Sequence, residues 1–182
     1  MPRLVVSPVL LLGLLLPAAA RADGAGPAAI GSRVPASLSF TDTRFLPRPL
    51  ADLQRRGDGR PASALALCFV TRRCPIARRY LPELVRLEQA YRARGVRFAV
   101  VDATPDPDVL ATAAFGQELD LPLPLVKDER GLAAGALGVT RSPEVALLDA
   151  QGVLRYRGRI DDRVQLALPL VAPGRALQHG AH

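Results

Sequence analysis

The chain of 182 residues carries 24 basic and 17 acidic residues, which gives it a formal net charge of +7. The basic residues are interleaved with acidic ones, tryptophan is absent and aromatic residues make up 4% of the chain, so we expect no nucleic-acid partner. The only two histidines, His179 and His182, lie at the C-terminal end. A Cys–His dyad, a Ser–His–Asp triad and a histidine-based zinc site are therefore excluded from the body of the chain, and we expect neither a metal nor a cofactor.

The N-terminal segment has the pattern of a secretory signal peptide. Arg3 provides a basic start, an apolar run covers residues 9–16, and Ala20-Arg21-Ala22 fits a small-x-small cleavage site. The alternative is an uncleaved membrane anchor, for which the run is short because a spanning helix needs about 20 apolar residues. We predict a signal peptide over residues 1–22, a periplasmic or secreted protein, and no stable membrane contact after cleavage.

The chain after this segment is long enough for one domain with a real core. Residues 23–35 are rich in Ala, Gly and Pro and are expected to form a flexible N-terminal arm. The domain itself is expected over residues 36–170, followed by a C-terminal tail over residues 171–182.

Hydrophobic periodicity and turn residues predict alternating strands and helices in the domain. The expected strands cover residues 38–40, 64–70, 96–101, 123–126, 144–149 and 152–159, and the expected helical segments cover residues 51–54, 75–94, 107–119 and 131–137. Crossover connections make strands parallel, whereas Ala150-Gln151 joins the last two strands as a hairpin. Arg155, Arg157 and Arg159 alternate in the last strand, which predicts one solvent-facing side. The predicted fold class is α/β, with helices flanking a central mixed sheet.

Cys74 is the main candidate for chemistry because it lies where the buried strand leads into the helix that begins at Pro75. A thiol at a helix N-terminus is close to the positive end of the helix dipole and to free backbone N–H groups. Arg72, Arg73 and Arg78 add positive charge nearby, and both effects favour the reactive thiolate.

Cys68 is interpreted as a small core residue, since free cysteine is among the most buried residue types. It precedes Cys74 across a segment that is mostly extended. A disulfide requires Cα atoms within about 7 Å, so direct pairing of the two cysteines would require the end of the strand to rearrange.

Three sequence features together resemble the thioredoxin superfamily. They are the strand ending in Thr71-Arg72-Arg73-Cys74-Pro75, the helix proline Pro82, and the segment Gly138-Val139-Thr140-Arg141-Ser142-Pro143-Glu144-Val145 before the hairpin. In that superfamily the active-site cysteine begins a helix and faces a cis-proline loop. Cys74 matches the first cysteine of the dithiol motif, Ala77 replaces the second, and Ser142-Pro143 matches the cis-proline position. The resemblance covers residues 36–162 and implies a thioredoxin-like fold.

Two branches of the superfamily compete. Cys74-Pro75-Ile76-Ala77-Arg78-Arg79-Tyr80 resembles the signature of the redoxin group, the peroxiredoxin-like proteins of the alkyl hydroperoxide reductase/thiol-specific antioxidant family. Thr71 matches the Thr-x-x-Cys spacing of peroxiredoxins, whereas Leu67 stands where that motif has proline. The exported thiol–disulfide oxidoreductases of cytochrome maturation share Pro82-Glu83-Leu84, but they have a second cysteine at the position of Ala77.

The resemblance implies a thiol oxidoreductase with an antioxidant function, most simply thiol-dependent peroxide reduction. Cys74 would attack a peroxide, and an external thiol or a thioredoxin-type reductant would restore it. Thr71 would hydrogen-bond the thiolate, Arg141 would stabilise charge on the leaving oxygen, and Ser142 and Pro143 would form the substrate loop. Two alternatives remain: a thiol–disulfide oxidoreductase acting on a disulfide substrate, and a catalytically silent module that binds a partner protein.

Overall fold

The structure, a computed structural model, describes residues 26–160 and 168–169. Its main sheet has seven strands in the order β2-β1-β5-β4-β3-β7-β8. These strands are β1 (Ser39–Asp42), β2 (Pro47–Pro49), β3 (Ala64–Val70), β4 (Val96–Asp102), β5 (Leu125–Lys127), β7 (Glu144–Asp149) and β8 (Leu154–Gly158). A separate two-stranded sheet pairs β6 (Arg141–Ser142) with β9 (Leu168–Pro169).

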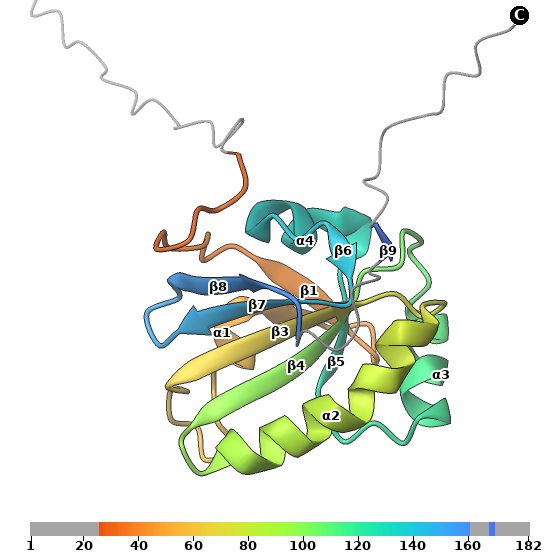
Figure 1. Cartoon of the computed structure of the whole chain (residues 1–182), viewed down its shortest axis with the longest axis horizontal. Helices are drawn as coiled ribbons and strands as arrows, with labels where there is room; N and C mark the ends of the chain where they lie inside the picture. The colour runs from red at the N-terminus through yellow and green to blue at the C-terminus, as the bar shows by residue number, and fades with distance from the viewer. Residues whose placement is uncertain (1–25, 161–167, 170–182) are drawn as a thin grey trace, which may run out of the picture.

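Helices cover both faces of the main sheet (Figure 1). The described helices are α1 (Leu50–Leu53), α2 (Pro75–Arg92), α3 (Val109–Glu118), the short 3-10 helix η1 (Glu129–Gly131) and α4 (Leu132–Leu137). Side chains of α2 and α3 join one buried cluster, and those of α1 and α4 join the cluster on the opposite face. The central strands β3, β4 and β5 are parallel, and the outer strands are antiparallel, which confirms the predicted mixed sheet.

The central strand β3 has the bounds that its apolar run predicts. It pairs in parallel with β4 over its whole length and antiparallel with β7. Alternate side chains enter the two clusters: Leu65, Leu67 and Phe69 on the α1 and α4 side, and Ala66, Cys68 and Val70 on the α2 side. Because both faces are buried, the strand needs apolar residues at every position.

Helix α2 begins directly after Cys74, which is its N-cap residue. Pro75 occupies the first helical position, where proline's missing N–H costs nothing. The helix continues through Pro82 and ends at Arg92. Gly95 follows with φ of 79°, a conformation that glycine adopts without strain, and it turns the chain into β4.

The β1–β2 hairpin is not predicted by the sequence, because the prolines of β2 are unfavourable for strand pairing. β2 is an edge strand, where proline is tolerated. The Asp42 carboxylate closes the turn by accepting hydrogen bonds from the backbone N–H groups of Arg44 at 2.9 Å and Leu46 at 3.0 Å.

The prediction of a solvent-facing side on β8 is wrong for one of its arginines. Arg155 is exposed and pairs with Asp149 at 2.7 Å. The Arg157 guanidinium instead donates to the backbone carbonyl of Leu137 at 2.8 Å and to that of Ala28 at 3.2 Å. A long arginine side chain thus covers the end of α4 and satisfies carbonyl groups there.

The described part of the predicted N-terminal arm is packed on the domain. The backbone N–H of Ala28 donates to Ala136 at 2.8 Å, and that of Val34 donates to Gly152 at 2.9 Å. Val34 is buried in the core, so the expectation of a flexible arm does not hold for these residues. The predicted signal peptide and C-terminal tail lie outside the described residues. Within the described part of the chain, no helix is long and apolar enough to cross a membrane.

Candidate active site

Cys74 lies between the start of α2 and the loop before β7. Its side chain has no exposed surface. The Sγ atom accepts a hydrogen bond from the backbone N–H of Ala77 at 3.4 Å and donates to the backbone carbonyl of Ser142 at 3.6 Å. The predicted meeting of the helix N-terminus and the Ser142-Pro143 loop at this cysteine is therefore present, and the Ser142–Pro143 peptide bond is cis.

Thr71 contacts Ser142, and its hydroxyl makes no hydrogen bond to the Cys74 thiol among the described residues, whereas its backbone carbonyl accepts the N–H of Cys74 at 3.0 Å. The backbone N–H of Thr71 donates to Ser142 Oγ at 2.8 Å, and the Thr71 hydroxyl lies 3.3 Å from the same oxygen. Ser142 is fully buried. These bonds connect the end of β3 directly to the cis-proline loop.

Arg141 lies next to Ser142, but its side chain is exposed. Its guanidinium makes no hydrogen bond or ion pair with any other residue that the structure describes. The loop is held through its backbone instead: Glu144 Oε2 accepts from the N–H of Thr140 at 2.8 Å and from that of Arg141 at 3.1 Å.

Two of the arginines around Cys74 have their charges paired. Arg72 lies 3.2 Å from Asp102 and 2.5 Å from Asp106. Arg78 pairs with Glu118 at 2.7 Å and lies over the ring of Phe115. Arg73 and Arg79 are exposed. The expected positive potential around Cys74 is therefore reduced by carboxylates that the sequence analysis did not assign to the site.

A buried polar network lies beside the site, where β4 and β5 end. Asp102 has no exposed surface and accepts hydrogen bonds from the N–H of Thr104 at 2.9 Å and the hydroxyl of Thr112 at 2.6 Å. Lys127, also fully buried, donates to the carbonyls of Asp102 at 3.1 Å and Thr104 at 2.5 Å, and its Nζ lies 3.8 Å from Asp102 Oδ2. Burial lowers the pKa of Lys127 below its ordinary value, although Asp102 partly opposes this.

This network supports the active-site loop, because Thr104 Oγ1 accepts the backbone N–H of Arg72 at 3.1 Å. The sequence offers one sign of this network: Asp102 is an acidic residue at the end of an apolar strand that lies beside β3. The parallel register of β3 and β4 brings the ends of both strands together.

Cys68 is on the same face of β3 as the core of α2 and is buried. Burial raises the pKa of its thiol to about 12. Both cysteines are free in the structure. These observations support the interpretation of Cys68 as a core residue. No group of three or more His, Cys, Asp or Glu side chains among the described residues could hold a metal ion.

Ser142→Ala should lower the free energy of unfolding by about 1–3 kcal/mol, because it leaves the N–H of Thr71 without its buried acceptor. Urea unfolding of this variant and the wild type measures the difference. Ser37→Ala is the control: Ser37 is exposed, so its substitution should change stability by less than about 0.5 kcal/mol. Equal stability of Ser142→Ala and the control would contradict the structural role of Ser142.

Lys127→Met should lower the free energy of unfolding by about 3 kcal/mol, since it leaves a buried carboxylate with less compensating charge. A double-mutant cycle with Asp102→Asn, measured by urea unfolding, should give a coupling energy above about 0.5 kcal/mol. Arg60→Met, at an exposed position, controls for loss of one positive charge. Additive effects of the two substitutions would show that Lys127 and Asp102 do not interact.

Stability should fall as the pH rises above 9, because the Cys68 pKa is raised from 9.0 in the unfolded chain to about 12 in the folded one. The unfolded state then loses the proton first, which costs the folded state up to about 1.4 kcal/mol per pH unit between these values. Cys68→Ala should show a shallower decline in unfolding free energy between pH 9 and pH 11. Identical slopes for this variant and the wild type would contradict the burial argument.

The sequence of this chain matches a known protein family. The sequence matches the family described as the AhpC/TSA family over residues 31–157. No curated protein matches the chain at a significant level.

Solved structures share the fold. An uncharacterized conserved protein from Geobacillus kaustophilus is 24% identical, with a TM-score of 0.63, over 74% of this chain and 70% of that one. A thiol:disulfide interchange protein from Bacteroides sp. is 18% identical, with a TM-score of 0.58, over 71% and 81%. A secreted Mycobacterium tuberculosis disulfide oxidoreductase homologous to E. coli DsbE is 23% identical, with a TM-score of 0.51, over 65% and 80%. With a thioredoxin fold and a family match over most of its length, the chain belongs to the AhpC/TSA family.

Proposed function

We propose that the protein is an exported thiol-dependent peroxidase in which Cys74 is the nucleophile. The observation that carries this proposal is a fully buried, single thiol held between the Ala77 N–H and the Ser142 carbonyl. A protein disulfide must align two sulfur atoms and their flanking chains with Sγ, whereas a hydroperoxide must align only two oxygen atoms. The complete burial of Cys74 therefore favours the smaller substrate.

The proposed reaction has two stages. The Cys74 thiolate attacks the terminal oxygen of a hydroperoxide, the O–O bond breaks, and the leaving alkoxide takes up a proton to become an alcohol or water. Cys74 becomes a sulfenic acid. One external thiol then forms a mixed disulfide with Cys74 and releases water, and a second external thiol frees Cys74 as the external disulfide forms. The reductant is a small thiol or a thioredoxin-type protein.

The residues around Cys74 have distinct proposed roles. The N-terminus of α2 and the Ala77 N–H stabilise negative charge on sulfur. Thr71 is a positioning residue, because its hydroxyl and N–H contact Ser142 and its carbonyl accepts the backbone N–H of Cys74. Arg141 is exposed beside the cis-proline loop, and its guanidinium is available to stabilise the developing charge on the leaving oxygen.

Export is part of the proposal and rests on the predicted signal peptide at residues 1–22. The shared fold of a secreted disulfide oxidoreductase supports it. The periplasm or the extracellular space would be the site of action.

Thiol–disulfide exchange is the second candidate, favoured by the contact between Cys74 and the cis-proline loop. In this reaction Cys74 would displace one thiol from a disulfide and remain in a mixed disulfide. Ala77 has no sulfur to resolve it, so an external thiol would again be required.

Cys74→Ser should reduce hydrogen peroxide consumption with excess dithiothreitol to the uncatalysed rate, because a serine hydroxyl cannot be oxidised in this way. Serine is a good N-cap residue, so the variant should fold, and circular dichroism checks this. Cys68→Ala is the matched control and should retain at least half of the wild-type rate.

Trapping with a sulfenic acid reagent, followed by mass spectrometry, should label Cys74 in the wild type after peroxide treatment. Equal peroxide consumption by the wild type and Cys74→Ser would reject the peroxidase. Reduction of a model disulfide that depends on Cys74, without peroxide consumption, would support the second candidate instead. Neither activity, in a folded protein, would favour the silent binding module.

A further inference from the structure

A cleft lies at the end of the sheet opposite to Cys74. Its volume is about 770 Å³, within the range of small-molecule sites. It is lined by residues of β1, β2, α1, α3, the start of β4 and the segment before β5. Because β4 is parallel to β3, the first residues of β4 are far along the strand from the end that supports the candidate active site.

The cleft arises because β5 covers only part of β4. β4 pairs with β3 from Val96 onward, but with β5 only from Val100. The last contact is the hydrogen bond from the Val100 N–H to the Pro124 carbonyl at 2.8 Å. Pro122 and Pro124 have no N–H to extend the ladder, so the chain diverges and leaves the first half of β4 without a neighbour on that side.

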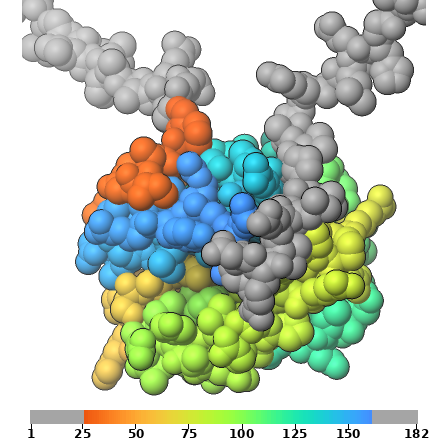
Figure 2. All heavy atoms as spheres, in the orientation of Figure 1, coloured from red at the N-terminus to blue at the C-terminus, as the bar shows by residue number. Residues whose placement is uncertain are grey.

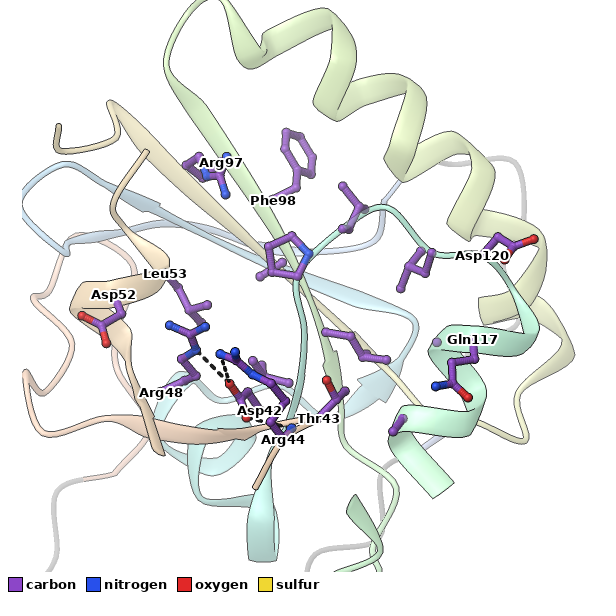
Figure 3. A pocket seen from close by; sticks show the side chains of 18 residues that line it. Asp42, Thr43, Arg44, Arg48, Asp52, Leu53, Arg97, Phe98, Gln117 and Asp120 are labelled. Atoms are coloured by element: carbon purple, nitrogen blue, oxygen red, sulfur yellow. Dashed lines mark hydrogen bonds and ion pairs between the residues drawn. The ribbon is translucent and has the colours of Figure 1, made fainter. Parts of the chain in front are cut away.

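About half of the wall of this cleft is apolar. Leu53, Phe98, Ala113, Leu123, Leu125 and Val126 line it. Figure 3 shows Arg97 and Phe98 at one end of the cleft and the Asp42–Arg44–Arg48 group at the other, with apolar side chains between them.

Two of the three arginines in the cleft share one carboxylate partner. Asp42, which is almost fully buried, pairs with Arg44 at 3.2 Å and with Arg48 at 3.2 Å. Burial tends to raise the pKa of Asp42, but hydrogen bonds from the N–H groups of Leu46 and Arg44 and from the Arg44 guanidinium outweigh it, and the pKa is lowered. Asp42 therefore remains a carboxylate and holds both cations.

Arg97 differs from these two arginines. Its Nε is the one buried side-chain nitrogen or oxygen in the described part of the chain without a hydrogen-bond partner. No ion pair joins its guanidinium to another described residue. The acidic residues Asp52 and Asp120, which also line the cleft, are exposed. A buried donor without a partner costs free energy, which an acceptor on a ligand would recover.

We propose that this cleft binds a small amphipathic monocarboxylate, with the carboxylate on Arg97 and the apolar body against Phe98 and Leu123. Planar guanidinium groups match carboxylates in charge and geometry. The apolar wall selects against small hydrated anions, and the charge of Arg97 selects against neutral ligands. This site is independent of the proposed chemistry at Cys74.

Isothermal titration of the full chain with octanoate, below its micelle concentration, tests the proposal. The wild type should bind one equivalent, and Arg97→Gln should weaken binding about tenfold or more, the effect of losing one charge-assisted hydrogen bond. Arg60→Gln, an exposed arginine away from the cleft, should bind as the wild type does. Ala113→Leu adds apolar volume inside the cleft on α3 without changing charge, and it should also weaken binding.

Octanol and inorganic phosphate are the two probe controls, and neither should match octanoate. If octanol bound as tightly as octanoate, the Arg97 charge would not contribute to binding. If phosphate bound as tightly as octanoate, the apolar part of the wall would not contribute. No octanoate binding by a folded wild type, or unchanged binding by Arg97→Gln, would overturn the proposal. Cys74→Ser should bind octanoate normally, which separates this result from the outcome of the peroxidase test.

Discussion

The hydrogen bond from the Thr71 N–H to Ser142 Oγ is the contact on which the candidate site depends. β3 and β7 pair antiparallel up to Phe69 and Glu144, and the same register places Thr71 opposite Ser142. Pro143 lies between these positions and has no N–H to continue the ladder. The Ser142 hydroxyl oxygen accepts the Thr71 N–H, where a continued ladder would supply a backbone carbonyl. The Ser142 carbonyl is thereby free to contact Cys74, and the strand end, the loop and the helix start form one unit.

Electrostatics around the site follow from backbone geometry more than from the basic composition of the chain. Arg72 and Arg78 are adjacent to Cys74 in sequence, yet carboxylates neutralise both. The Ala77 N–H and the dipole of α2 point at Sγ regardless of side-chain charge. Arg72 instead has a structural role, because it joins the site loop to the buried Asp102 at the end of β4. The charges of Arg72 and Arg78 therefore form ion pairs within the protein and do not act on the Cys74 thiol alone.

The sequence predicts the parts of this fold that depend on continuous patterns. β3 and β4 are apolar runs with clear ends, and α2 has proline at its start and glycine after its end, so their positions follow from local rules. The meeting of Cys74, Thr71 and Ser142 is predicted through the family resemblance. The β1–β2 hairpin is missed because two prolines hide an edge strand, and the packing of residues 28–34 is missed because it depends on contacts with distant residues. Lys127 is missed for a similar reason: only the neighbouring strand end provides the carbonyls that make its burial possible.

Proline ends strand pairing near both of these places by the same mechanism. Pro143 ends the pairing of β3 with β7, and the buried Cys74 lies beside the loop that contains it. Pro124 ends the pairing of β5 with β4 toward the opposite end of the sheet, and the opening there contains Arg97. In each case a residue without an N–H stops the ladder while the neighbouring strand continues, so backbone or side-chain polar groups near the gap need other partners. At Cys74 the protein supplies those partners through Ser142, whereas at Arg97 the described residues supply none. The two places therefore differ in chemistry: the polar groups at Cys74 have partners within the protein, whereas the cleft at Arg97 is complementary to a ligand that brings its own acceptor.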